Sequence, residues 1–372
     1  MEKVNNKPWQ MCRCRVGNVL VSRENPADFV EYPQGIQADL ARFFGEWFSD
    51  APTLSVHTSG STGEPKVWRV RKEQMMNSAR ITCEALGLRA GDRALLCMPL
   101  DYIAGKMVVV RALVAGLELV VREPSGHPLA DIVEPLHFAA MVPLQVYDSL
   151  QIEEEEKRLA AVGNLIIGGG AIDRALEERL RAMPNRVYST YGMTETLSHI
   201  ALRRLNGPEA SAFYRPFPSV RLALSEEQTL VIDAPLVCDE LLHTNDVAEI
   251  RADGSFRILG RRDNIVSSGG IKIQLEQVEE ALRPLMPVRF ALTSVPHPKF
   301  GEALVLLHEG DALPQEVVAR MQALLPKYQQ PKYIFAVDAI PLTGTGKISR
   351  AACRELARCS WSLEVFKKDS LR

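Results

Sequence analysis

The sequence predicts a large N-terminal domain of the α/β class that carries a small β subdomain, followed by a small α+β C-terminal domain. Short apolar runs alternate with amphipathic helical patterns through the first half of the chain, which is typical of an α/β sheet. Closely spaced strand-like segments follow, and the last part mixes both patterns. We place the boundary between domains 1–260 and 261–372.

The first predicted element is an amphipathic helix over residues 36–48, because its apolar residues recur at helical spacing. A glycine-rich segment follows at residues 58–66. The alternation then runs through strand-like ALLCMPL (94–100), a helix over 106–115, strand-like LELVV (117–121) and FAAMVPL (138–144), an acidic helix near Glu153, strand-like NLIIGGG (164–170) and a helix over 175–183.

After about Phe213 the pattern changes to short β-like segments separated by turn residues, which predicts the small β subdomain. These segments are VRLALSE (220–226), TLVIDAP (229–235), DVAEIRADG (246–254) and SFRILG (255–260). The C-terminal domain is predicted from helical patterns at 274–285 and 315–325 and from strand-like FALTSV (290–295), ALVLLH (303–308) and YIFAVDAI (333–340).

Composition narrows the class of protein. The formal charge of −2 over 372 residues gives no general positive field for a nucleic acid or an anionic membrane. Seven scattered cysteines indicate a reducing cytoplasm rather than a disulfide framework, and we expect Cys12 and Cys14 in an edge strand rather than in a metal site. No signal-peptide core or membrane-spanning run is present, so we expect a cytoplasmic protein without a membrane span.

The glycine-rich segment has the composition of a phosphate-binding loop. Glycines let the backbone aim N–H groups at a ligand, hydroxyls add donors, and a lysine adds a positive charge. The spacing is not that of a nucleotide-kinase P-loop, and the remaining alternative is a solvated linker. The candidate polyphosphate-binding residues are Thr58, Ser59, Gly60, Ser61, Thr62, Gly63 and Lys66.

This segment, TSGSTGEPK, resembles the phosphate loop of the adenylate-forming (ANL) superfamily of AMP-binding enzymes, although Val67 stands where a glycine is common. Tyr191-Gly192-Met193-Thr194-Glu195 resembles the second signature of that family. The resemblance implies that Tyr191 and Gly192 border the adenine, that Thr194 and Glu195 take part in catalysis, and that Glu195 helps to hold Mg²⁺. Taken alone, the same five residues could be a turn that precedes a helix.

Three further segments are similar to motifs of this family. Gly168-Gly169-Gly170-Ala171 is similar to the turn that lies against the nucleotide, which implies nucleotide contacts for Gly169, Gly170 and Ala171. Asp246 resembles the ribose-binding aspartate, whose two oxygens can accept from both ribose hydroxyls, although a turn aspartate is as good an alternative from the residue alone. The segment 260–263 resembles the hinge, with Arg261 reaching ribose or phosphate and Asp263 acting as the pivot.

The C-terminal signatures complete the resemblance. Ser268-Gly269-Gly270-Ile271-Lys272-Ile273 looks like the segment that faces CoA, where Gly269 and Gly270 allow a thin pantetheine arm past the backbone. Lys347, in TGTGKISR, matches the catalytic lysine, whose ammonium can stabilise the charge that grows on the α-phosphate. Only 57 residues precede the phosphate loop, so we expect the N-terminal subdomain of the family to be missing or reduced.

Among acyl-CoA ligases, the segments MPLDYIAGK, AAMVPLQV and YGMTETLSHIAL resemble the o-succinylbenzoate-CoA ligases of menaquinone synthesis. The resemblance implies a small-molecule carboxylic acid, ATP, Mg²⁺ and CoA as ligands, and allows a homodimer. A second carboxylate on the acid needs a cation or a donor cluster, for which Tyr102, Thr196, Ser198 and His199 are candidates. A ligase for another aryl or fatty acid and a non-catalytic nucleotide-binding protein remain alternatives.

Overall fold

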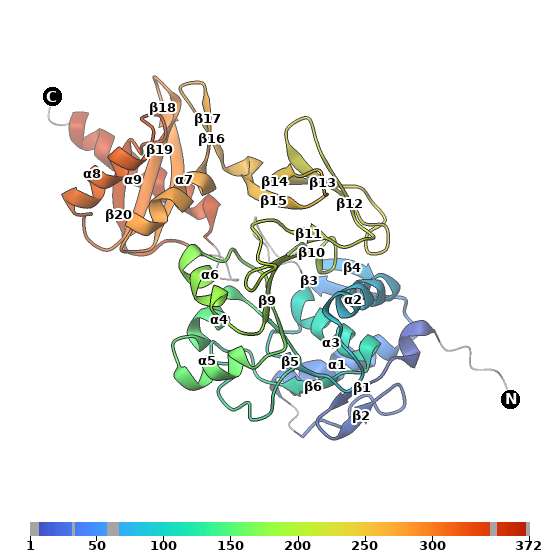
Figure 1. Cartoon of the computed structure of the whole chain (residues 1–372). Coiled ribbons are helices and arrows are strands. Elements are labelled where there is room, and N and C mark those ends of the chain that lie inside the picture. Colours follow the sequence, from blue (N-terminus) through green and yellow to red (C-terminus); the bar gives the residue numbers. More distant parts are fainter. Residues whose placement is uncertain (1–6, 32–33, 58–66, 343–347, 370–372) are drawn as a thin grey trace.

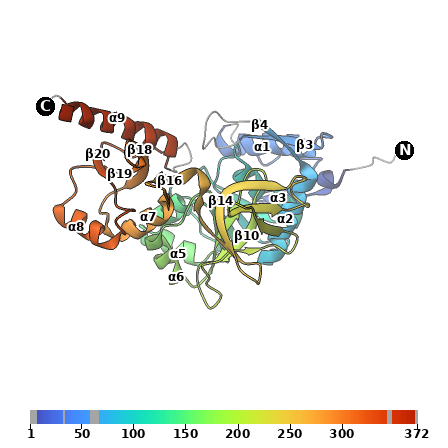
Figure 2. The same ribbon diagram turned by 90° about the horizontal axis from the view of Figure 1, so that it is seen from above.

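The computed structural model describes residues 7–31, 34–57, 67–342 and 348–369, and their side chains up to residue 362 except that of His57. Figure 1 shows the N-terminal half around one large sheet, a smaller sheet next to it, and the C-terminal part on the far side of that smaller sheet. The view from above in Figure 2 places helix α9, Arg350–Asp369, on the opposite side of the molecule from helix α1, Gly35–Phe48.

The large sheet has nine strands in the order β11-β10-β9-β8-β7-β5-β6-β1-β2. The six strands from β9 to β1 are parallel, and antiparallel strands close both edges. Their bounds are β1 Cys14–Val16, β2 Val19–Val21, β5 Arg93–Leu96, β6 Glu118–Val121, β7 Phe138–Met141, β8 Asn164–Ile167, β9 Arg186–Gly192, β10 His199–Arg204 and β11 Arg215–Pro216.

The helices of this part of the chain lie on both sides of the sheet (Figures 1 and 2). They are α1 Gly35–Phe48, α2 Lys72–Leu86, α3 Ile103–Ala115, α4 Pro143–Ser149, α5 Glu153–Ala160 and α6 Arg174–Arg181. A short 3-10 turn, Pro8–Met11, precedes β1, and a separate antiparallel pair is formed by β3 Thr53–His57 and β4 Val67–Arg71.

Two smaller sheets follow. The first is antiparallel and consists of β12 Arg221–Leu224, β13 Thr229–Asp233, β14 Leu242–Ile250 and β15 Phe256–Arg261. After a 3-10 turn, Arg262–Asn264, the second sheet consists of β16 Ile265–Ser268, β17 Ile271–Gln274, β18 Phe290–His297, β19 Gly301–Glu309 and β20 Tyr333–Val337. Helices α7 Leu275–Leu282, α8 Gln315–Leu324 and α9 Arg350–Asp369 accompany the second sheet, and a 3-10 turn, Arg283–Leu285, follows α7.

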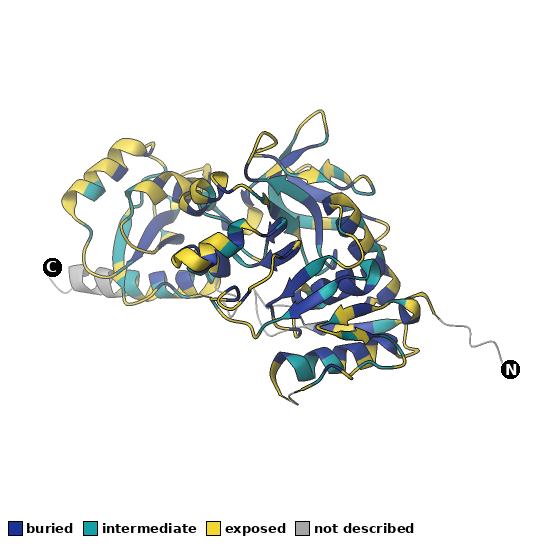
Figure 3. Cartoon of the chain, turned by 60° about the horizontal axis from the view of Figure 1, so that its bottom comes forward, coloured by how far each residue is buried: buried dark blue, intermediate teal, exposed yellow. Residues whose placement is uncertain are grey.

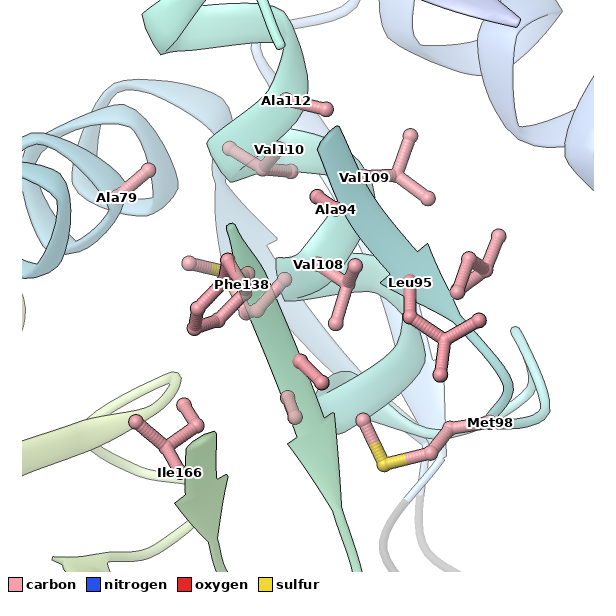
Figure 4. Close-up of a cluster of buried hydrophobic side chains, with 14 of the residues drawn as sticks. Ala79, Ala94, Leu95, Met98, Val108, Val109, Val110, Ala112, Phe138 and Ile166 are labelled. Atoms are coloured by element: carbon pink, nitrogen blue, oxygen red, sulfur yellow. The ribbon is translucent and has the colours of Figure 1, made fainter. Parts of the chain in front are cut away.

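Among the described residues, the buried side chains form one large core and two small ones. The large core runs from Trp9 to Phe256, and Figure 4 shows its centre, where valines of α3 pack against Leu95 of β5 and Phe138 of β7. The two small cores begin at Val266 and at Ala291 and lie in the last sheet and its helices. Figure 3 shows that buried residues concentrate along the strands. The proposed boundary at residues 260/261 falls between the large core and the small ones.

The structure confirms the predicted α/β layers, the β subdomain and the α+β unit. It also adds α2 and α9, which the sequence patterns did not single out. The prediction that Cys12 and Cys14 lie in an edge strand is wrong: Cys12 precedes β1, and β1, which contains Cys14, lies between β6 and β2. Within the described residues, every helix is too short or too polar to cross a bilayer.

Candidate active site

The carboxyl ends of the parallel strands β7, β8 and β9 lie next to one another, and the glycine turn follows the middle strand. Gly169 has φ +78°, which favours glycine. A Cβ atom on Gly168 would lie 2.3 Å from Thr190 Oγ1 of β9, whereas Gly170 approaches Pro143 after β7. The structure therefore places Gly169, Gly170 and Ala171 at the carboxyl ends of the parallel strands, which is where α/β proteins bind ligands.

The second signature forms the turn of a β-hairpin rather than the start of a helix. β9 ends at Gly192, which pairs with His199 at the start of the antiparallel strand β10. Gly192 is required by packing, because a Cβ atom there would lie 2.3 Å from Ser198 O. The buried Thr196 hydroxyl closes the turn: it accepts from Met193 N at 3.0 Å and donates to Ser198 O at 2.8 Å.

Thr194 and Glu195 lie in this turn and are half-buried. Among the described residues, neither side chain has a hydrogen bond or ion pair. The described part of the chain also holds no cluster of three or more acidic, histidine or cysteine side chains that could bind a metal ion. A single carboxylate nevertheless fits Mg²⁺ that is shared with a nucleotide, because Mg²⁺ keeps several waters and takes its other oxygens from phosphates.

Tyr191, Asp246 and Arg261 are brought together from the nine-stranded and the four-stranded sheets. The Tyr191 hydroxyl donates to Asp246 Oδ2 at 2.6 Å, and Arg261 Nη1 lies 3.1 Å from Asp246 Oδ1. The ring of Tyr191 also packs edge-on against Phe256 of β15, with 5.2 Å between centroids. Burial, and secondly the charge of Asp246, raises the pKa of Tyr191, so the phenol remains a donor.

Asp263 lies in the 3-10 turn that leads into the last sheet. Its Oδ2 accepts from Arg261 Nη2 at 2.9 Å and from Asn245 Nδ2 at 3.1 Å. The backbone oxygen of Arg261 accepts from Gln274 Nε2 at 2.9 Å. The predicted pivot is therefore tied both to the residue that precedes Asp246 and to Arg261.

Gly269 and Gly270 form the turn between β16 and β17, with φ values of +59° and +83°. Gly269 N donates to Phe300 O at 2.8 Å. The ammonium groups of Lys299 and Lys332 both lie 5.6 Å from the centre of the Phe300 ring. The segment predicted to face CoA thus has two cations nearby, Lys299 on the loop between β18 and β19 and Lys332 directly before β20.

Two groups of predicted residues lie outside the described residues: Thr58, Ser59, Gly60, Ser61, Thr62, Gly63 and Lys66 of the phosphate loop, and the catalytic candidate Lys347. Their surroundings are described. His57 pairs with Val67 in β3 and β4, which flank the loop. The residues that flank the segment with Lys347 are also paired: Leu342 pairs with Ile348, and Ser349 N donates to Pro341 O at 2.8 Å.

Sequence reasoning missed Arg111, a buried arginine on α3 that is only 2% exposed. Its Nη2 lies 2.5 Å from Ser198 Oγ, its guanidinium lies 6.0 Å from the ring centre of Phe138, and its Nε has no hydrogen-bond partner. Among the described residues, no carboxylate pairs with it. Burial lowers its pKa to about 10, so it is still charged at neutral pH. The available signal was a charge within the apolar run 107–113.

The four candidate acid-binding residues are placed differently. Ser198 touches Arg111, and His199 lies next to Ser198, is 7% exposed and has its pKa lowered by burial and by the Arg111 charge. Thr196 has a structural role inside the hairpin turn. Tyr102 precedes α3 and is 37% exposed. The structure therefore groups Ser198 and His199 with Arg111.

The chain matches the AMP-binding enzyme family over residues 21–237 and the AMP-binding enzyme C-terminal domain over residues 277–347. The 2-succinylbenzoate–CoA ligase of Lactococcus lactis is 24% identical in an alignment of 316 positions that covers 79% of this chain and 69% of that protein. The Geobacillus protein of the same name is 28% identical in an alignment of 352 positions that covers 83% of this chain and 70% of that protein.

Among solved structures, an acyl-CoA synthetase (AMP-forming)/AMP-acid ligase II-like protein from Dyadobacter fermentans is 34% identical, with a TM-score of 0.63 over 89% of this chain and 97% of that one. The o-succinylbenzoate CoA synthetase of Bacillus subtilis, in complex with its acyl-adenylate, is 21% identical with a TM-score of 0.68, over 80% and 68% of the chains. At that identity the likeness concerns the fold. Together with the two family matches, these similarities show that the chain belongs to the family of AMP-binding enzymes.

Proposed function

We propose that this protein is an AMP-forming acid–CoA ligase. In the first step a carboxylate oxygen of the acid attacks the α-phosphorus of ATP, the bond to pyrophosphate breaks, and acyl-AMP forms. In the second step the sulfur of CoA attacks the acyl carbon, the thiol proton is released, and AMP leaves. The observation that carries this proposal is the meeting of Tyr191, Asp246 and Arg261 beside the carboxyl ends of β8 and β9.

The roles of the residues follow from the chemistry that each step requires. The phosphate loop with Lys66 holds the triphosphate, Glu195 shares Mg²⁺ with it, and Asp246 holds the ribose. Lys347 supplies the charge that stabilises the pentacoordinate phosphorus. The small C-terminal domain rotates about Asp263 between the two steps, so that Gly269 and Gly270 face CoA in the second. A cytoplasmic location, where ATP and CoA are available, is part of this proposal.

We propose o-succinylbenzoate as the acid. The names of several relatives support this substrate, and so does Arg111, because a buried cation without a counter-charge is costly and a ligand carboxylate would neutralise it. Side chains on a helix tilt toward its N-terminus, and the N-terminus of α3 follows the carboxyl end of β5. The Arg111 side chain is thus directed toward the carboxyl ends of the strands, where the candidate site lies.

The second candidate is a ligase for a monocarboxylic aryl or fatty acid. The two candidates differ in what happens to Arg111, since a monocarboxylate would leave its charge unpaired after the acid has bound. A site built to pair a carboxylate rejects an analogue that lacks it. We therefore favour the dicarboxylic acid.

Pyrophosphate release and CoA-thioester formation, measured with ATP, Mg²⁺ and CoA saturating, test the proposal. The panel contains o-succinylbenzoate, its two monocarboxylate analogues 4-oxo-4-phenylbutanoate and 2-butanoylbenzoate, benzoate and octanoate. We expect o-succinylbenzoate to have the highest kcat/KM by at least about 100-fold. A monocarboxylate that equals it would refute the proposed acid and leave the ligase chemistry standing.

A further inference from the structure

Behind Arg111, three buried side chains (Arg111, His199 and Thr82) and the half-buried Ser198 form a continuous chain of hydrogen bonds. Arg111 Nη2 on α3 lies 2.5 Å from Ser198 Oγ, and Ser198 Oγ lies 3.2 Å from His199 Nδ1. On the other side of the imidazole ring, His199 Nε2 lies 3.2 Å from Thr82 Oγ1 on α2. Thr82 Oγ1 in turn lies 3.1 Å from Ser78 O.

The two ends of this hydrogen-bond chain, Arg111 and Ser78 O, determine which atom donates in each of its hydrogen bonds. A guanidinium can only donate, and a backbone carbonyl can only accept. Thr82 therefore gives its one hydroxyl hydrogen to Ser78 O, one turn back on its helix, and must accept from His199 Nε2. That leaves Nδ1 of a neutral His199 as the acceptor for the Ser198 hydroxyl, whose oxygen accepts from Arg111.

In the other protonation states of His199, the hydroxyl hydrogen of Ser198 has no acceptor among the described residues. A charged His199 would donate from both ring nitrogens, so Ser198 Oγ would face two donors while its own hydrogen found no acceptor among the described residues. It would also put a second cation beside the buried Arg111. The opposite neutral tautomer would give the same conflict at Ser198.

We propose that Thr82 and His199 are positioning residues for acid recognition. They hold Ser198 with its lone pairs toward Arg111, which fixes the guanidinium and leaves its other N–H groups for the second carboxylate of the acid. Neither Ser198 nor His199 then touches that carboxylate, since both have their hydrogens engaged. This inference rests on the proposed function only in assigning Arg111 to the second carboxylate of the acid.

The matched variants are Thr82→Val, which keeps the shape and removes the hydroxyl, and Thr82→Ser, which keeps the hydroxyl. KM and kcat are measured with o-succinylbenzoate and with the better of its two monocarboxylate analogues, and KM for ATP checks that the protein is folded. We expect Thr82→Val to raise KM for o-succinylbenzoate about tenfold and to leave kcat and the KM for the analogue unchanged. Thr82→Ser should behave like the parent protein.

Equal effects of Thr82→Val on the dicarboxylate and the analogue, or no effect on either, would overturn the inference while leaving the ligase proposal intact. If the parent protein does not use o-succinylbenzoate at all, the proposed acid and this inference both fall. A second measurement does not depend on activity: ¹⁵N NMR of histidine-labelled protein, assigned with His199→Asn, should show His199 protonated at Nε2 only. Protonation at Nδ1 would contradict the proposed donors and acceptors in this series of hydrogen bonds.

Discussion

The hydroxyl of Tyr191 donates to Asp246 Oδ2 at 2.6 Å, and this contact joins the end of β9 in the nine-stranded sheet to β14 of the four-stranded sheet. The second oxygen of Asp246 pairs with Arg261 at 3.1 Å. Each carboxylate oxygen has two lone pairs, so one direction on each remains for a ribose hydroxyl. Two side chains thus orient the proposed ribose-binding residue before the nucleotide arrives.

Tyr191→Phe should therefore raise KM for ATP about fivefold, because Asp246 loses the donor that orients it. The control is Tyr188→Phe in the same strand, whose hydroxyl accepts from Arg204 at 3.0 Å away from the site. Steady-state kinetics with varied ATP compare the two variants. An equal change in both would mean that the Tyr191 hydroxyl has no special role.

Lys347→Ala should slow acyl-AMP formation by at least about 100-fold, because the charge that stabilises the α-phosphate transition state is removed. Thioester formation from preformed acyl-AMP should persist, since in that step the CoA sulfur attacks the acyl carbon and no phosphorus is attacked. Lys327→Ala, on an exposed part of the same domain, serves as the control. Near-normal pyrophosphate release by Lys347→Ala would show that another group performs this role.

Asp263→Pro should separate the two half-reactions. Proline fixes φ, so the segment at the pivot can no longer change its backbone conformation, and we expect adenylation to continue while thioester formation fails. Asp263→Ala removes the contacts to Arg261 and Asn245 without fixing φ and is the matched control. Loss of both half-reactions to the same extent would point to a different hinge.

Stability should depend on pH through His199. Burial, and secondly the Arg111 charge, lowers the pKa of this side chain, so the folded protein keeps it neutral where the unfolded chain binds a proton. The contribution of His199 to the free energy of unfolding is fully present above pH ~6.5, the ordinary pKa of histidine. It is lost as the pH falls toward the pKa of His199 in the folded protein. Between pH 7.5 and 5.5 the loss should be about 1 kcal/mol.

Urea denaturation of the parent protein and of His199→Gln at both pH values measures this difference. The parent protein should lose about 1 kcal/mol more than the variant over the interval. His243→Gln, at an exposed position on β14, should lose as much as the parent protein. Identical losses in the parent and in His199→Gln would mean that His199 does not stay neutral in the folded state.

The alternation of apolar runs and helical patterns was enough to predict the layers, since it depends on local periodicity. α2 was missed because its buried face includes Lys72, Gln74, Ser78 and Thr82, which interrupt an apolar stripe. The position of Cys14 was wrong because strand order depends on pairings far apart in the sequence.

The candidate site shows the same limit. The resemblance identified Tyr191, Asp246 and Arg261 as members of one site, and the structure brings them into contact across 55 and 15 positions of sequence. Arg111 could not be recognised from its surroundings in the sequence, because its meaning depends on Ser198, a contact 87 positions away. A charge inside an apolar helix is the kind of local conflict that marks such positions.

Transfer of oxygen from the acid to AMP is the most direct test of the central claim. The protein is incubated with ATP, Mg²⁺, CoA and o-succinylbenzoate labelled with ¹⁸O in its carboxylates, and the nucleotide product is analysed by mass spectrometry. Attack of a carboxylate oxygen on the α-phosphorus predicts AMP that carries one ¹⁸O atom, formed in equal amount to the thioester. Unlabelled AMP, or ADP with phosphate in place of AMP, would contradict an acyl-adenylate.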